Sequence, residues 1–298
     1  MADNDKIMLW RKAIDERLRG ILRVCRYPRD LVEVIEYSLF PSGKRLRPIL
    51  FLAWHDTVCP PTDAAVYFAC GIELYHTFTL IHDDMPCLDN DDFRRGKPSV
   101  HKTFGESKAL LAGDALFALA YTVMLEACSG GQYALTELVS SLFGDRGVIS
   151  GQYDDVFDNS SSVGDVMKIY ERKTAALIYA ACVSGALFHS ARTAHPDEVK
   201  RYIADGALAD MDGGMLGANG LDCANAAAYG KSFGTAFQLY DDLSEYSAGE
   251  CADGASVLEY IGFEDAKRAL NEQIAAAKRA AYDKSSVLVE LANKFDIA

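Results

Sequence analysis

Acidic residues are crowded into one short stretch of the sequence. Five aspartates lie between Asp83 and Asp92, and Arg94 and Arg95 follow shortly after them. Carboxylates this close together repel one another unless a cation lies among them. A hard divalent cation such as Mg2+ removes that repulsion, typically with a phosphate as a shared ligand. A solvated acidic loop is the alternative, whereas a calcium loop of the EF-hand type would need a glycine and a closing glutamate that are missing here.

The helical pattern around this stretch makes its acidity more unusual. Asp83 and Asp84 fall near the C-terminal end of an apolar helical run, where each negative charge opposes the helix dipole by roughly 0.3–1 kcal/mol. Sequences that break a local preference in this way most often do so at functional sites. His76, Thr79 and Asp83 are spaced at i, i+3 and i+7, so they share one face of that helix.

A second acidic cluster lies far along the chain. Asp241, Asp242 and Glu245 fall near the end of another predicted helix. Asp241 and Glu245 are four residues apart, so they face the same way and repel each other unless a cation bridges them. Metals in a diphosphate site bridge phosphate oxygens to aspartates, while Arg and Lys neutralise the remaining charge. Two carboxylate sets with dispersed cations therefore predict a site for a metal-bound diphosphate.

Two basic segments are candidates for the cations of such a site. The first is the turn-like stretch Gly43-Lys44-Arg45-Leu46-Arg47-Pro48, which does not match a nucleotide P-loop because Ser38 stands where the first glycine would be. The second is Glu171-Arg172-Lys173-Thr174, inside an otherwise apolar helix, where charge is costly unless it is paired. A solvated turn and a helix face at the surface are the respective alternatives.

Helices must position all of these residues. Apolar residues at helical spacing predict helices over the ranges 6–24, 29–40, 49–58, 63–85, 107–128, 163–188, 198–216, 223–246 and 263–281. Pro86 ends the helix that carries the first acidic cluster, and Ser107 is a plausible N-cap for a later one. With no alternating strand pattern, the chain is predicted to be all-α, a single bundle of about ten or more helices in one domain, 1–298.

Composition restricts the classes of partner and compartment. The net charge of −13 argues against nucleic acid as a partner. The longest uncharged apolar run, 175–188, is too short for a membrane span, so we expect none. The N-terminus has no apolar segment of the signal-peptide type, and the eight cysteines are scattered singly, as in a reducing cytosol. A cytoplasmic protein is the expectation.

Taken together, the motifs closely resemble those of the trans-isoprenyl diphosphate synthases, the farnesyl and geranylgeranyl diphosphate synthase family, over nearly the whole chain. Asp83-Asp84-x4-Asp89 resembles the family's first aspartate-rich motif, and Asp241-Asp242-x2-Glu245 its second. The resemblance implies the isoprenoid synthase fold, a helical bundle around a central cavity. It also implies three Mg2+ ions on an allylic diphosphate, with metal ligands among Asp83, Asp84, Asp89, Asp241, Asp242 and Glu245.

The resemblance also assigns the two substrates to residues. The positions matching those that bind isopentenyl diphosphate are Gly43, Lys44, Arg47, His76 and Arg95. Those around the allylic diphosphate are Arg94, Lys173 and Gln238, with Thr174 facing the allylic cation and Gln152 and Asp155 lining the site. The catalytic set implied is Asp83, Asp84, Asp89, Arg94, Lys173 and Asp241.

The implied reaction is ionisation, condensation and elimination. Mg2+ and cationic side chains stabilise pyrophosphate as it leaves, the double bond of isopentenyl diphosphate attacks the allylic cation, and a proton is lost. Such a protein supplies preorganised charge and a dry cavity and needs no covalent nucleophile. We expect a homodimer acting on isopentenyl diphosphate and an allylic diphosphate of the dimethylallyl or geranyl type.

Two departures from the family's pattern keep another class of function open. Glu245 is one methylene longer than the usual aspartate, and the segment 246–256 has no Lys or Arg where the family has a longer, lysine-containing loop. The third metal site is therefore uncertain. A weakly catalytic or non-catalytic subunit of a heterodimeric synthase is the alternative, and a terpene cyclase is disfavoured because the isopentenyl diphosphate residues would have no role.

Product length depends on the residues just before the first motif. In the family, an aromatic residue five positions ahead of that motif is typical of C15 synthases, and here that residue is Phe78. Helical geometry places Phe78 about 140° around the axis from Asp83, so Thr79 points more directly along the acidic face. The resemblance favours farnesyl diphosphate (C15) as the product, with C20 and C10 products as alternatives. The alternative for Phe78 is that it is an ordinary core residue with no role in product length.

Overall fold

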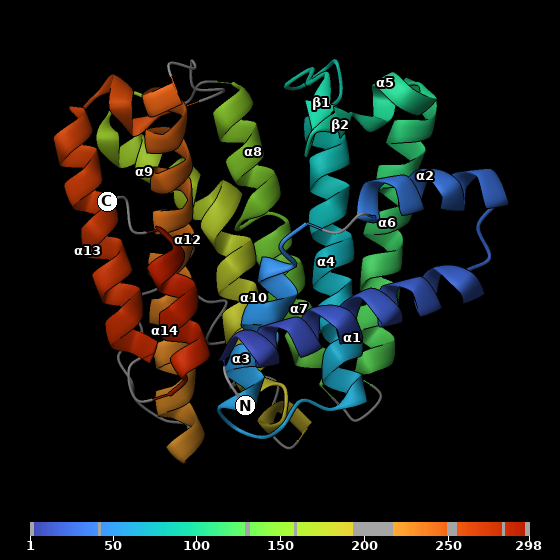
Figure 1. Ribbon diagram of the computed structural model, residues 1–298, viewed down its shortest axis with the longest axis horizontal. Coiled ribbons are helices and arrows are strands. Elements are labelled where there is room, and N and C mark those ends of the chain that lie inside the picture. Colours follow the sequence, from blue (N-terminus) through green and yellow to red (C-terminus); the bar gives the residue numbers. More distant parts are fainter. Residues whose placement is uncertain are drawn as a thin grey trace. The chain divides into compact units, whose positions relative to one another are not determined.

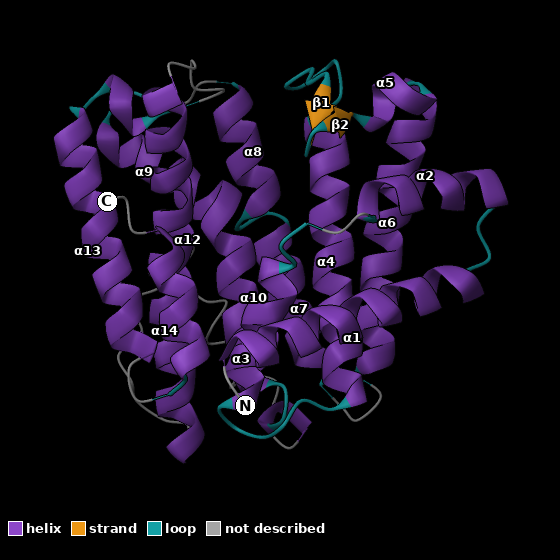
Figure 2. Ribbon diagram, viewed as in Figure 1, coloured by secondary structure: helices purple, strands orange, loops and turns teal. Residues whose placement is uncertain are grey.

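The computed structural model describes residues 3–40, 43–128, 132–157, 160–192, 217–248, 255–281 and 284–295. These residues are almost entirely helical, with one short two-stranded hairpin (Figures 1 and 2). The predicted all-α class is confirmed. The chain divides into two compact units, the first Met1–Leu52 with Pro61–Gly130 and the second Ala53–Pro60 with Gly131–Ala298. The organisation of 1–298 as one domain stays a prediction.

The first unit is built around two long helices, α4 (Asp63–Asp83) and α6 (Glu106–Ala127), which lie side by side and run antiparallel (Figure 1). Glycines allow their close approach. A Cβ built on Gly71 would lie 2.4 Å from Met124 Cγ, and one on Gly113 would lie 2.1 Å from the ring of His82. Helix α4 is buried on most of its sides, as its apolar composition dictates.

Other elements of the first unit surround this pair. They are α1 (Asp3–Val24), α2 (Arg29–Leu39), the start of α3 (Leu46–Asp56), the strands β1 (Phe93–Arg94) and β2 (Lys97–Pro98), and α5 (Val100–Phe104). The antiparallel β1–β2 hairpin pairs Phe93 with Pro98 and Arg94 with Lys97, near the C-terminal end of α4 (Figure 2). It carries both arginines of the acidic segment, so its placement decides where their charges lie.

The second unit contains the last residues of α3 and the remaining helices. These are α7 (Tyr133–Phe143), α8 (Val148–Val156), α9 (Val163–Tyr170), a π-helical turn (Glu171–Ala175), α10 (Ala176–Leu187), α12 (Gly217–Ala248), α13 (Phe263–Ala281) and α14 (Ser286–Ala292). Helix α12 packs against both α10 and α13. A Cβ on Gly234 would lie 2.5 Å from Ala175 Cα, so this glycine lets α12 approach the π-helical turn closely.

Several sequence predictions are refined by the structure. The predicted helix 163–188 is interrupted by the π-helical turn Glu171–Ala175, which contains the whole charged cluster. Helix α6 begins at Glu106 after Gly105, so Ser107 is not its N-cap. The hairpin was not predicted because two-residue strands are too short to show an alternating pattern. The predicted helix 198–216 lies outside the described residues.

Two helices bear on the expected absence of a membrane span. By length and composition, α4 and α6 are apolar enough to cross a membrane, but 67% and 50% of their most apolar windows are buried within the structure. Core helices of folded domains have the same composition, and α4 and α6 pack on each other. The composition of α4 and α6 is therefore weak evidence for a membrane-spanning helix.

Candidate functional site

A cluster of cations forms around Gly43 in the first unit. The guanidinium of Arg95 lies directly against this glycine, because a Cβ built there would fall 2.6 Å from Arg95 Cζ. Only glycine permits that approach. Arg95 itself has a φ of 55°, a left-handed conformation that costs a non-glycine residue on the order of 1 kcal/mol and is found most often at functional sites.

Arg47 and His76 meet in the same unit. Arg47 Nη1 lies 3.0 Å from His76 Nε2. Because arginine can only donate, His76 Nε2 must accept, and the ring is neutral. Burial and the nearby cations Arg47 and Arg95 lower the pKa of His76 well below its ordinary value. The predicted isopentenyl diphosphate residues Arg47 and His76, like Gly43 and Arg95, are therefore brought together, and Lys44 is exposed beside them.

Arg45 is a part of this arrangement that sequence reasoning missed. Its side chain is fully buried and donates hydrogen bonds to Asp15 Oδ1 at 2.8 Å, Glu73 Oε1 at 2.7 Å and the Leu39 carbonyl at 2.7 Å. It also adopts a left-handed φ of 50°. Arg45 thus fixes the backbone between Gly43 and Arg47 instead of facing a ligand. The available signal was Glu73, an acid within an apolar helix that required a buried partner.

The cluster has an excess of positive charge. Burial, together with Arg45 and Arg94, lowers the pKa of Arg95, and Glu73 only partly opposes this. Within the described part of the chain, no side-chain hydrogen bond or ion pair involves Arg95. A guanidinium with cationic neighbours and no counter-ion favours a bound anion, and phosphate oxygens match its donor geometry.

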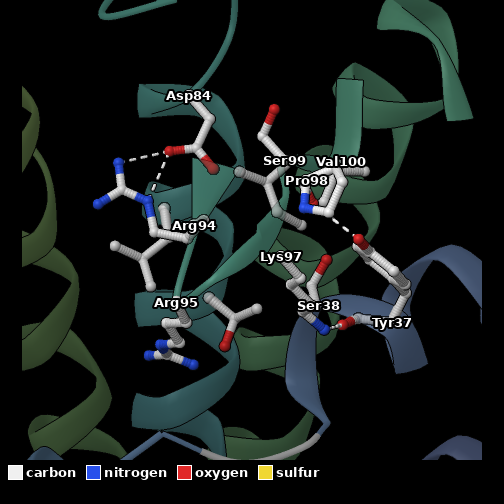
Figure 3. Close-up of a pocket in the computed structure, with 12 residues that line it drawn as sticks. Tyr37, Ser38, Asp84, Arg94, Arg95, Lys97, Pro98, Ser99 and Val100 are labelled. Carbon is white, nitrogen blue, oxygen red and sulfur yellow. Dashed lines mark hydrogen bonds and ion pairs between the residues drawn. The ribbon is translucent and has the colours of Figure 1, made fainter. Parts of the chain in front are cut away.

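Asp84 and Arg94 form an ion pair at the start of the acidic segment (Figure 3). Arg94 also contacts Asp91 Oδ2 at 2.6 Å. Burial raises the pKa of Asp84, although its pairing with Arg94 opposes the change. Burial alone would lower the pKa of Arg94, but Asp84 and Asp91 raise it. Asp84 and Arg94 are thus engaged with each other in this structure.

Asp83 and Asp89 are arranged differently from Asp84. The turn after α4 folds back so that the backbone N–H of Asp89 donates to the Asp83 carbonyl at 3.0 Å. Asp89 is exposed and Asp83 partly exposed. Two neighbouring carboxylates at a water-accessible turn fit a hard cation that takes its other ligands from phosphate and water. The described residues contain no group of three or more His, Cys, Asp or Glu that would hold a metal unaided.

A pocket lies between α2, α4 and the hairpin (Figure 3). It contains about 350 Å³ of space, part of it open to solvent. Leu80 and Ile81 supply its apolar side, and Arg94, Arg95 and Lys97 line it from the hairpin. Asp84 faces this pocket, about 100° around α4 from Asp83. Adjacent aspartates of one motif therefore face different surroundings.

In the second unit, Lys173 is held by Asp155. Their charged groups are 2.5 Å apart, and the other oxygen of Asp155 accepts from the Ala255 backbone N–H at 2.9 Å. A Cβ on Gly151 would lie 2.2 Å from the backbone nitrogen of Lys173, so this glycine lets α8 approach the π-helical turn. The neighbouring Gln152 has a buried Nε2 with no hydrogen-bond partner among the described residues, which suits a donor awaiting a ligand.

Thr174, Gln238 and Asp242 form one hydrogen-bonded chain. Thr174 Oγ1 donates to Gln238 Oε1 at 2.9 Å, and Gln238 Nε2 donates to Asp242 Oδ1 at 3.2 Å. Asp242 Oδ2 accepts from the Tyr170 hydroxyl and from Ser256 Oγ. Asp242 is 4% exposed, and its oxygens are already used within the unit. Asp241 and Glu245 are partly exposed and lie one turn apart on α12.

Phe78 and Thr79, the two candidates for setting product length, point in different directions from α4. The ring of Phe78 packs 5.2 Å from that of Phe117 on α6 and 5.1 Å from that of Tyr75. It is thus directed towards α6. Thr79 Oγ1 donates to the His76 carbonyl at 2.9 Å. The role of either residue in product length stays a prediction. That the acidic clusters around Asp83 and Asp241 bind one diphosphate together also stays a prediction.

Comparisons with known proteins agree with this chemistry. The family model for polyprenyl synthetase matches residues 28–209. The chain is 36% identical over 206 residues to a chloroplastic geranylgeranyl pyrophosphate synthase from Capsicum annuum, covering 66% of this chain and 54% of that protein. It is 40% identical over 173 residues to the large subunit 1 of a heterodimeric geranylgeranyl pyrophosphate synthase from Arabidopsis thaliana, covering 54% of this chain and 47% of that one.

The chain thus spans about half the length of the curated relatives it matches. The solved structure of an FPP/GFPP synthase from Zymomonas mobilis resembles it throughout, with a TM-score of 0.78 and 30% identity over 98% of both chains. That likeness confirms the predicted isoprenoid synthase fold. Since the family model covers more than half of the sequence, this chain belongs to the polyprenyl synthetase family.

Proposed function

We propose that this protein joins isopentenyl diphosphate to an allylic diphosphate, forming a longer trans-prenyl diphosphate and releasing pyrophosphate. The observation that carries the proposal is the cationic cluster of the first unit, in which Arg95 lies against Gly43 with no ion pair to any described residue and Arg47 donates to a neutral His76. A diphosphate supplies the missing negative charge and accepts bidentate hydrogen bonds from guanidinium groups. Membership of the polyprenyl synthetase family supports this substrate class.

The residues of the first unit bind isopentenyl diphosphate in this proposal. Arg47 and Arg95 donate to the diphosphate, and Lys44 adds a flexible charge at the exposed edge. Gly43 lets the diphosphate come close to the backbone, as it already admits the Arg95 guanidinium. His76 stays neutral because the cations around it lower its pKa, so it fixes Arg47 without adding to the repulsion.

The residues of the second unit act on the allylic diphosphate. Lys173 exchanges its contact with Asp155 for a phosphate oxygen, which charge-assisted bonding favours. The chain from Thr174 through Gln238 to Asp242 holds the Gln238 amide in one orientation beside the site. Because Thr174 and Asp242 hold the Gln238 amide before the substrate arrives, this amide needs no reorganisation at the moment of reaction.

The reaction breaks the C–O bond of the allylic diphosphate, and its electron pair leaves with pyrophosphate. The double bond of isopentenyl diphosphate then attacks the allylic cation, and a proton from the condensed product passes to pyrophosphate. Lys173 stabilises the charge that develops on the leaving group. None of the protein's own side chains forms a covalent bond with the substrate.

Magnesium ions are the cofactor implied by the family. Asp83 and Asp89 would hold Mg2+ at the first motif, and Asp241 and Glu245 at the second; the number of ions stays open. When bound, the metal supplies charge neutralisation on the leaving pyrophosphate. Asp84 and Asp242 are less suited as ligands because their oxygens are used by Arg94 and by Tyr170, Gln238 and Ser256.

The curated relatives favour a C20 product over the C15 product that the sequence favoured. Those relatives are named geranylgeranyl pyrophosphate synthases, and Phe78 packs towards α6 instead of along the face of Asp83. We therefore propose geranylgeranyl diphosphate as the product. The solved relative named an FPP/GFPP synthase shows that this fold accommodates other lengths.

A subunit of a heterodimeric synthase is the second candidate. Its supporting observations are the similarity to a large subunit of such an enzyme and the lack of Lys or Arg in the segment 246–256. Homodimer formation and a cytoplasmic location are the corresponding proposals for a self-sufficient enzyme. Product formation by the isolated chain separates the two candidates.

The test is a prenyltransfer assay with the purified full chain, Mg2+, labelled isopentenyl diphosphate and dimethylallyl, geranyl or farnesyl diphosphate. We expect an extended product with the wild-type protein and none after chelation of the metal. Arg95→Met should remove binding of isopentenyl diphosphate, whereas Lys108→Met, an exposed lysine on α6, should not. A lone chain that is inactive until a partner subunit is added would favour the second candidate.

A further inference from the structure

The β1–β2 hairpin needs an anchor that its own strands do not provide. Each strand has only two residues, and so short a hairpin is not stable by itself in water. Yet it carries Arg94 and Arg95, and Arg95 must keep its guanidinium against Gly43. The contacts that fix this hairpin therefore also control the proposed diphosphate site.

Lys97 joins the hairpin to the end of α2. Its Nζ donates to the carbonyl oxygen of Tyr37 (Figure 3). It also donates to the Phe40 carbonyl at 3.0 Å and lies 4.0 Å from the centroid of the Tyr37 ring. The last carbonyls of a helix have no intrahelical partners and carry its negative dipole end. An ammonium over an aromatic ring adds a cation–π attraction. Lys97 is thus engaged by two backbone carbonyls and a ring, and we do not assign it as a ligand for substrate.

Tyr37 completes the anchor from the side of α2. Its hydroxyl donates to the Pro98 carbonyl at 2.7 Å and accepts from Thr103 Oγ1 at 3.2 Å. Its ring meets Phe104 edge-on, with centroids 5.1 Å apart. One side chain on α2 therefore contacts β2 and α5 at once, and Figure 3 shows it reaching across to Pro98.

The anchor formed by Tyr37 and Lys97 places the Lys97 charge near that of Arg95, which is electrostatically unfavourable. Burial and the nearby Arg95 lower the pKa of Lys97, so two like charges are held close together. Helix α2 ends only a few residues before Gly43. The same contacts therefore tie the end of α2, through Tyr37 and Phe40, to the strand that follows Arg95. A local rule broken in this way points to a functional constraint.

We propose that Tyr37 and Lys97 are positioning residues, which hold Arg95 against Gly43 and so set the affinity for isopentenyl diphosphate without touching it. This inference rests on the proposed function and deepens it. The anchor should act mainly on isopentenyl diphosphate, because Arg94, the hairpin's other arginine, is also held by its ion pairs with Asp84 and Asp91. The allylic diphosphate residues Lys173 and Gln238 belong to the second unit.

The test measures binding and kinetics of three full-length variants, Lys97→Met, Tyr37→Phe and Lys97→Arg. Calorimetric titration with isopentenyl diphosphate should show Kd raised about tenfold in Lys97→Met, equivalent to about 1.4 kcal/mol. Tyr37→Phe should show a smaller rise in the same direction. Lys97→Arg should restore most of the affinity, because a guanidinium also donates to two carbonyls and stacks on the ring.

Two readouts separate positioning from general destabilisation. KM for isopentenyl diphosphate should rise in Lys97→Met, while KM for the allylic diphosphate and kcat at saturation change less than about twofold. Lys102→Met is the matched control, because the ion pair of Lys102 within the described residues is an exposed one with Asp92, next to the hairpin, and such pairs contribute little. It should leave both KM values unchanged.

The outcomes distinguish this inference from the proposed function. A wild-type protein that does not bind isopentenyl diphosphate overturns the proposed function and the inference together. Wild-type binding with unchanged affinity in Lys97→Met and Tyr37→Phe overturns the inference alone. An equal loss for both substrates that follows a drop in melting temperature shows a structural role only, and also overturns it.

Discussion

Arg94 Nη2 lies 2.5 Å from Asp84 Oδ1 and 2.6 Å from Asp91 Oδ2, so one arginine neutralises two of the five aspartates that precede it. Asp83, immediately before Asp84, lies outside this pairing, and its carbonyl accepts from the backbone of Asp89. The acidic segment is therefore divided between a salt-bridged half and a half that fits a cation. Neighbouring positions of one motif have separate physical roles.

Asp84→Asn should lower stability, and Asp83→Asn should lower activity. The side chain of Asp84 is only 3% exposed, so removing its charge leaves Arg94 with one fewer buried partner and costs about 1–3 kcal/mol of unfolding free energy. Urea denaturation of both variants measures this difference. Asp83→Asn should instead reduce kcat/KM on the order of a hundredfold or more through lost metal ligation. Equal stability of the two variants would contradict the division.

The second acidic cluster should divide in the same way. Asp242 accepts from Tyr170, Gln238 and Ser256, so Asp242→Asn places an amide among donors and should destabilise the protein by about 1–3 kcal/mol. Asp241→Asn should raise the Mg2+ concentration needed for half-maximal activity. Denaturation curves and metal titrations of both variants test this. A shift in metal dependence with Asp242→Asn alone would reverse the assignment.

His76 should make stability depend on pH below neutrality. Its folded pKa lies well below the ordinary value because of burial, Arg47 and Arg95, so only the unfolded state takes up the proton as pH falls through about 6.5. Unfolding free energy should therefore decrease with falling pH, by up to about 1.4 kcal/mol per unit for this one group. Denaturant titrations between pH 7.5 and pH 5 measure the slope.

The matched variant for this pH effect is His76→Gln, whose amide oxygen can still accept from Arg47 but does not titrate. The slope between pH 6.5 and pH 5 should be smaller in His76→Gln than in the wild type. His55, whose pKa is also lowered by burial, remains in both proteins and so cancels in the comparison. Identical slopes would show that His76 is protonated in the folded state.

Product length should respond to Thr79 more than to Phe78. Thr79 lies about 40° around α4 from Asp83, whereas the ring of Phe78 packs against Phe117. Thr79→Phe should therefore shorten the main product by one isoprene unit. Phe78→Leu should leave its length unchanged while costing about 1 kcal/mol of stability. Chromatography of the dephosphorylated prenols reads both results, and a longer product from Phe78→Leu would restore Phe78 as the cap.

Much of the scaffold could be read from local sequence. The apolar run from 63 onwards and Pro86 predicted α4 to within two residues of its observed end at Asp83, because helical periodicity and the missing proline N–H act locally. The helix 263–281 was predicted with the bounds of α13. Charge crowding identified the acidic clusters for the same reason, since like charges at adjacent positions interact whatever the fold.

The partners of those charges could not be read locally. Arg45 is joined to Asp15 and Glu73, and Asp242 to Tyr170, by contacts between residues far apart in sequence. No periodicity encodes such pairs. The π-helical turn that carries Lys173 is likewise packed closely by Gly151 of α8 and Gly234 of α12. Helix propensities of single residues do not predict such packing.

The sequence by itself determined which residue types are present, that they lie on helices, and that acids and cations suited to a diphosphate occur together. Tertiary structure decided which of two adjacent aspartates is buried against Arg94 and which lies at the partly exposed turn, as with Asp84 and Asp83. Successive helical residues point about 100° apart, so each meets a different set of neighbours. Those neighbours arrive from distant segments, and only packing brings them into place.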